Sequence, residues 1–219
     1  SRLAADSKKD EVRNDIQETL LHLYSLIIPA AFAFLFLGRP IAQFIFSGSS
    51  SGDSGQIGLI LSGFALGLIP FCSSYLLLRG FYAFEDTKTP AGITGVMNVV
   101  TIAFAVIAYL VLPIRLITVG IAISFGIGYL ASSLWARHLL AKRIGHLHLG
   151  RDFMGIAAIS ILSFAPSILI SRVVRNFFVA EPSALLPSLA TLSSSGVIAL
   201  VIYLLLGYRL RIAPVTSTA

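Results

Sequence analysis

The sequence predicts an all-α fold, a polytopic membrane helix bundle of about six transmembrane helices. Hydrophobic residues make up 56% of the 219 positions, charged residues only 12%, and the mean hydropathy is +0.89. Several charge-free stretches reach the length of about 20 residues that a helix needs to cross a bilayer. Because backbone groups in lipid must bond within their own segment, these stretches favour helices. The alternating segments of about ten residues that a membrane barrel needs are missing.

Charge, Gly or Pro bounds each expected span. The six spans are residues 20–37, 57–78, 91–112, 119–136, 153–171 and 184–206. We expect a cytoplasmic amphipathic lead-in over 1–19, a four-helix part over 20–140, a basic loop over 141–152, two additional transmembrane helices over 153–207 and a tail over 208–219. Gly38-Arg39-Pro40 is expected to end the first span, with residues 41–46 along the interface and a flexible loop rich in Ser and Gly over 47–55.

The basic residues predict the orientation. Threading the six spans alternately puts twelve of the sixteen Lys and Arg residues on the face that holds both ends of the chain. By the positive-inside rule, both ends are expected to be cytoplasmic. No signal peptide opens the chain, and we expect it to be a piece of a longer protein.

Ionisable groups avoid the span interiors. All ten carboxylates fall in loops, so the sequence offers no site for a coupling ion at membrane depth. His146 and His148 lack the further ligands of a metal site, and Cys72 is alone. No nucleotide-binding or hydrolase motif is present, which predicts no enzymatic activity and no cofactor. Basic residues in short clusters between apolar spans indicate lipid headgroups rather than nucleic acid as the counter-charge.

Small residues recur at helical spacing in two spans and predict close helix packing. A second interpretation of the same pattern is a helix surface along which a neighbouring helix slides during alternating access. These residues are Gly63 and Gly67 in the second span and Gly120, Ser124, Gly128 and Ser132 in the fourth.

The segment from Arg79 to Pro90 is the most distinctive in the chain. Asp86, with the threonines that follow, can hydrogen-bond local amides and cap the next helix, and Pro90 suits its first turn. Basic side chains at both ends can reach phosphates or an acidic loop residue. A rigid turn and a gating contact at the cytoplasmic mouth are both consistent with these features. The candidate residues are Arg79, Phe81, Tyr82, Asp86, Thr87, Lys88, Thr89 and Pro90.

This segment resembles the R-x-F-Y-A-x-x-D-T-[KR]-T-P signature of the MurJ/MviN family of lipid II flippases, within the MOP exporter superfamily. Ser1–Ala5, Ile28-Pro29-Ala30 and Asn98 are similar to the family as well. The resemblance makes the six spans equivalent to helices nine to fourteen, the C-terminal lobe plus two extra helices. It also implies a charge-free groove for a polyprenyl tail between the last two spans, while the arginines that engage the substrate lie in parts absent here.

The resemblance implies a multi-pass protein of a bacterial cytoplasmic (inner) membrane. It also implies a part in flipping the lipid-linked peptidoglycan precursor, lipid II, across that membrane by alternating access. Its expected partners are lipid II, membrane lipids, the N-terminal lobe of the full-length chain and proteins of cell-wall synthesis. We expect residues 1–219 alone to be inactive. The alternatives are another exporter of the superfamily, which moves lipid-linked polysaccharide or drugs, and a non-transporting membrane scaffold for cell-wall synthesis.

Overall fold

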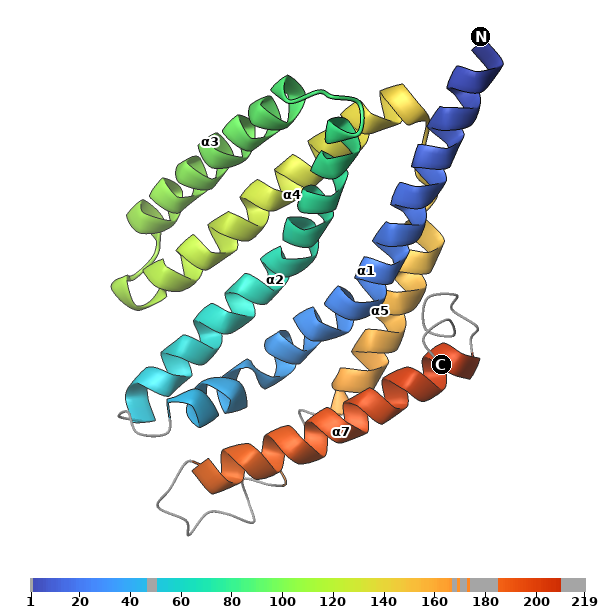
Figure 1. Cartoon of the computed structure of the whole chain (residues 1–219). Helices are drawn as coiled ribbons and strands as arrows, with labels where there is room; N and C mark the ends of the chain where they lie inside the picture. Colours follow the sequence, from blue (N-terminus) through green and yellow to red (C-terminus); the bar gives the residue numbers. More distant parts are fainter. Residues whose placement is uncertain (1, 47–50, 167–168, 170–172, 174–184, 210–219) are drawn as a thin grey trace. The chain divides into compact units, whose positions relative to one another are not determined.

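The computed structural model describes residues 2–46, 51–166, 169, 173 and 185–209, and all its long elements are helices (Figure 1). A short 3-10 turn, η1 (Ile114–Leu116), leads into the fourth of them. The helices are α1 (Arg2–Ile45), α2 (Ser51–Tyr82), α3 (Lys88–Val111), α4 (Ile117–Ile144), α5 (Gly150–Phe164) and α7 (Leu185–Arg209).

The predicted fold class is confirmed, because the protein is a polytopic helix bundle. Within the described residues, five helices are long and apolar enough to cross a membrane. The expected span over 153–171 corresponds to α5, of which residues 150–164 are described, and part of this span lies outside the described residues. The expected tail over 208–219 lies outside them from residue 210 onward.

Several helices extend beyond the expected spans. Residues 41–45, expected along the interface, continue α1, and residues 51–55, expected in a flexible loop, begin α2. Residues 141–144 of the expected basic loop form the last turn of α4. Charge marks the point where a span meets water, but a helix continues past that point, and basic side chains near its C-terminus favour the helix dipole. The prolines at 29 and 40 are accommodated inside α1.

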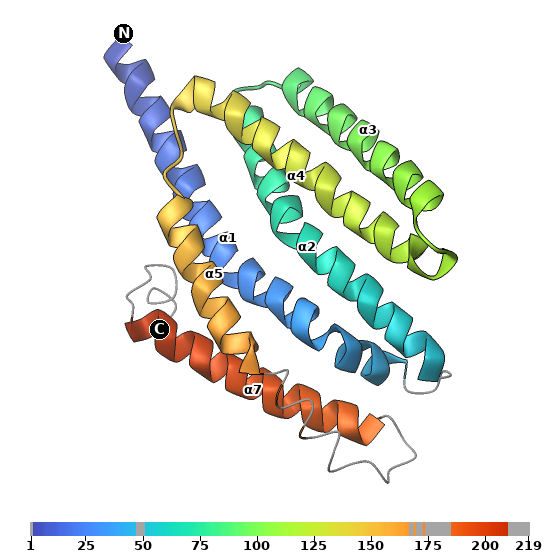
Figure 2. The same ribbon diagram turned by 180° about the vertical axis from the view of Figure 1, so that it is seen from behind.

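The chain divides into two compact units, Ser1–Ile27 with Gly67–Phe153 (unit 1) and Ile28–Leu66 with Met154–Ala219 (unit 2). In unit 1, α3 and α4 lie side by side and run antiparallel, as both views show (Figures 1 and 2). Glycines allow their close approach: a Cβ atom at Gly120 would lie 2.8 Å from Cβ of Ala108, and one at Gly128 would overlap the hydroxyl of Thr101.

Helix α2 contacts α4 on another side. A Cβ atom on Gly67 would lie 2.8 Å from Cα of Gly126, and further along the helices the hydroxyl groups of Ser74 and Ser132 are 2.6 Å apart. The sequence offset between the paired residues is nearly constant, so α2 and α4 run parallel. The expected small-residue seam of α4 therefore serves two neighbours, because Gly120 and Gly128 meet α3 whereas Ser132 meets α2.

Four buried serines bond to their own helix in the same way. Each hydroxyl donates to the carbonyl four residues earlier at 2.7–2.8 Å, as Ser124 does to Gly120. The others that do so are Ser73, Ser160 and Ser163. This local bond satisfies a polar group that has no water to bond to in lipid.

Unit 2 has its own close contact and its own core. A Cβ atom on Gly58 would lie 2.8 Å from Cα of Arg39, which brings the end of α1 against the start of α2. Leu37, Phe164 and Ala199 form a buried apolar cluster from α1, α5 and α7. Gly63, the remaining residue of the predicted packing pattern, is buried in the same unit.

We predict that Gly67→Ala destabilises the protein, because the added methyl group meets backbone rather than a side chain that can rotate away. The apparent melting temperature in detergent micelles should fall. Gly95→Ala is the matched control, since a Cβ atom there meets nothing within 4 Å and alanine favours the helix. Equal melting temperatures for the two variants would contradict the close α2–α4 contact.

Candidate functional site

A tight turn joins α2 to α3 and carries most of the candidate residues. The amide of Asp86 donates to the carbonyl of Phe81 at 3.1 Å, and that of Glu85 donates to Tyr82 at 3.0 Å. Glu85 adopts a positive φ of 57°, which is uncommon for a residue other than Gly. These bonds end α2 and direct the chain into α3 within five residues.

Asp86 organises this turn. Its carboxylate accepts a 3.0 Å bond from the backbone amide of Thr89 and a 2.7 Å bond from the Thr89 hydroxyl, and it forms an ion pair with Arg143 at the end of α4. The two bonds from Thr89, followed by Arg143, lower the pKa of Asp86 from 3.8 to about 2. Asp86 therefore joins the first turn of α3 to the last turn of α4.

The remaining candidate residues divide into buried and exposed groups. Phe81 is fully buried, and the guanidinium of Arg143 lies 5.5 Å from its ring centroid, a cation–π contact. Pro90 is buried in the first turn of α3. The exposed residues are Arg79, Tyr82, Thr87 and Lys88, and Thr87 makes no side-chain cap bond. Arg143 could not be predicted as the partner of Asp86, since nothing in the sequence says which of several basic residues reaches that carboxylate.

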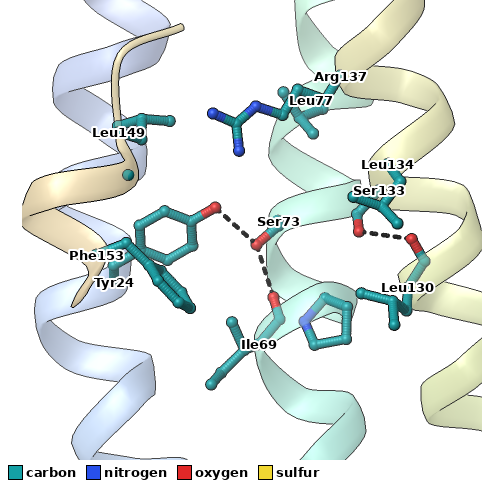
Figure 3. Close-up of a pocket in the computed structure, with 12 residues that line it drawn as sticks. Tyr24, Ile69, Ser73, Leu77, Leu130, Ser133, Leu134, Arg137, Leu149 and Phe153 are labelled. Carbon is teal, nitrogen blue, oxygen red and sulfur yellow. Dashed lines mark hydrogen bonds between the residues drawn. The ribbon is translucent and has the colours of Figure 1, made fainter. Parts of the chain in front are cut away.

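A second site in unit 1 is a cavity of about 210 Å³ between α1, α2, α4 and the start of α5 (Figure 3). Its lining is mostly apolar. One cation, Arg137, and the hydroxyl groups of Tyr24, Ser73 and Ser133 complete it. The apolar lining residues are Ile69, Pro70, Leu77, Leu130, Leu134, Leu149 and Phe153, and Gly150 also lines it.

The polar groups of this cavity are held in place by bonds across unit 1. Ser73 contacts the Tyr24 hydroxyl at 3.2 Å and the carbonyl of Ile69 at 2.7 Å (Figure 3). The Tyr24 ring packs edge-on against Phe153 with centroids 5.2 Å apart. Arg137 donates to the carbonyl of Leu147 at 2.9 Å. Tyr24 lies far from Ser73 in the sequence, so no spacing pattern could have found this site.

The polar groups at these two sites can bind charged or hydrogen-bonding partners. Among the described residues, no group of three or more His, Cys, Asp or Glu side chains could hold a metal ion. The polar features are a carboxylate engaged in a turn and a guanidinium beside apolar side chains. Five apolar helices and these two sites define an integral membrane protein that crosses the bilayer several times.

Comparison with known proteins narrows this class to one family. A family model described as lipid II flippase MurJ matches residues 1–206, so the chain belongs to the MurJ family. A probable lipid II flippase MurJ of Rhizobium meliloti (strain 1021) is 33% identical over 146 residues, which is 66% of this chain and 26% of that protein. One of Rhizobium tropici is 30% identical over 116 residues, 52% of this chain and 22% of that protein.

The chain thus spans about a quarter of the length of these curated relatives. No solved structure matches it.

We predict a pH-dependent contribution of Asp86 to stability. Because its folded pKa of about 2 lies below the ordinary 3.8, the contribution is complete above pH 3.8 and is lost as the pH falls through about 2. The melting temperature of Asp86→Asn should lie below that of the wild type near neutral pH, and the gap should close as the pH approaches 2. Glu85→Gln, which removes a neighbouring exposed carboxylate, is the matched control. A gap that does not change with pH would contradict the assignment.

Proposed function

We propose that this chain forms the C-terminal part of a lipid II flippase, which moves the lipid-linked peptidoglycan precursor across the cytoplasmic membrane by alternating access. Membership of the MurJ family over residues 1–206 carries this proposal. The reaction transfers a lipid between leaflets and forms no covalent bond. The described helices support it because five of them are long and apolar enough to cross a membrane.

The remainder of the protein has to supply what this part lacks. The substrate carries a pyrophosphate, and the basic residues of this chain are concentrated at helix ends rather than along one transmembrane path. We infer that the N-terminal lobe of the full-length chain provides the main charge site, and that this part provides an apolar wall for the polyprenyl tail. Proteins of cell-wall synthesis are the expected neighbours at the membrane.

Depletion of the full-length protein in its native host tests this function. Lipid II should accumulate in the inner leaflet, as measured with a probe specific for the outer leaflet, and the cells should lyse. Re-expression of the full-length protein is the control and should restore the outer-leaflet signal. An unchanged distribution of lipid II after depletion would exclude the flippase function.

We propose further that the α2–α3 turn and the end of α4 face the cytoplasm, because most Lys and Arg residues belong to that face. In a Cys72→Ser background, Lys142→Cys should react with a membrane-impermeant maleimide only after the cells are permeabilised. Ile114→Cys, at a position 85% exposed on η1, should react in intact cells. The reverse pattern would invert the topology.

A further inference from the structure

We propose that the cavity in unit 1 binds the phosphate group of a membrane phospholipid. The positive charge of Arg137, which lines the cavity, is the first observation that supports a phosphate as the ligand. Arg137 projects into the cavity from α4, and its hydrogen bond to the carbonyl of Leu147 uses one of the five N–H donors of a guanidinium. Arg13 pairs with Asp10 and Arg143 with Asp86, and neither of these ion pairs in the described part of the chain includes Arg137. Asp152, close by in sequence, does not line the cavity.

The other polar groups make Arg137 the main donor to an anion. Ser73 and Ser133 donate to carbonyl oxygens of their own helices, at 2.7 Å and 3.0 Å. A hydroxyl has one proton, so these serines offer acceptors to the cavity rather than donors. Tyr24 contacts Ser73, and Figure 3 shows its hydroxyl and the Arg137 guanidinium both directed toward the centre of the site. A phosphate, which accepts hydrogen bonds, therefore has to be held mainly by Arg137.

The apolar lining indicates a ligand with hydrocarbon next to its charge. Seven of the twelve lining residues are Ile, Leu, Pro or Phe. A free phosphate ion would leave these side chains without a partner, whereas the glycerol and upper acyl carbons of a phospholipid would cover them.

The depth of the cavity also fits a phospholipid. Arg137 lies seven residues before the end of α4, which corresponds to about 10 Å along the helix. Half of a bilayer's hydrocarbon core is about 15 Å thick, so the guanidinium lies within reach of the headgroup layer. Exposed basic residues at the same end of unit 1, Arg79 and Lys88, add attraction for anionic lipids.

The size of the cavity separates this site from the transport path. A volume of about 210 Å³ lies below the roughly 300–1,000 Å³ of pockets that hold drug-sized ligands. It can hold a phosphate and the adjoining carbons, but not the glycan and peptide of a peptidoglycan precursor. The proposed lipid therefore remains bound while the transported lipid passes elsewhere.

Native mass spectrometry of the full-length protein in detergent micelles tests this proposal without lipid II. Phosphatidylglycerol, phosphatidylcholine and inorganic phosphate are titrated separately. We expect one tightly bound phosphatidylglycerol to be lost in Arg137→Gln, with an affinity at least roughly tenfold weaker at that site. Glutamine retains a donor for Leu147, which protects the fold. Lys142→Ala removes an exposed positive charge from the same helix and should bind like the wild type.

A second variant separates loss of the site from loss of the fold. Ser133→Leu fills the cavity but retains Arg137, and it should lose the same phosphatidylglycerol. Wild-type lipid binding in both variants, at unchanged melting temperature, would overturn the proposal. If inorganic phosphate binds the wild type but not Arg137→Gln, while phosphatidylglycerol binds both equally, the ligand is a free anion and the phospholipid is excluded.

Discussion

The close approach of α2 and α4 is the contact on which the rest of unit 1 depends. Two parallel helices touch through Gly67 and Gly126, and again through Ser74 and Ser132. Between these two contacts the rings of Phe71 and Tyr129 pack edge-on with centroids 4.8 Å apart. Leu77, Leu134 and Arg137 of the same two helices face a shared space, which α1 and the start of α5 complete as the cavity. Small residues therefore bring the two helices together, and larger side chains beside them line the cavity.

The turn at Asp86 completes this arrangement at the helix ends. Helix α3 connects the parallel pair, and its first turn is fixed to Asp86 while Arg143 fixes the same carboxylate to α4. The fully buried ring of Phe81 lies under the Arg143 guanidinium. One carboxylate therefore serves as a helix cap and as an ion-pair partner, which explains why an acidic residue is needed at this position.

The features that could be predicted from the sequence are those set by residues close together in the chain. Helical membrane spans follow from hydropathy, and the bond between Asp86 and Thr89 follows from their spacing of three residues. Arg143, Tyr24 and Arg137 could not be assigned, because their partners are distant in sequence and many similar residues compete. Helices α1 and α4 end at residues 45 and 144, beyond the expected spans that end at residues 37 and 136, because hydropathy reports where lipid ends and a helix can continue into water. The small-residue pattern of α4 indicated packing but could not show that it serves two neighbouring helices.

The serines that line the cavity affect which groups its wall can attract. A hydroxyl whose proton is donated to a carbonyl of its own helix, as in Ser73 and Ser133, presents only lone pairs. Such a wall resembles an ether more than an alcohol: it accepts from water, ammonium or amide groups and repels phosphates and carboxylates. An anionic group therefore meets a mildly unfavourable wall at these serines and gains attraction only at Arg137. Polarity judged from residue names alone would have assigned this wall the opposite preference.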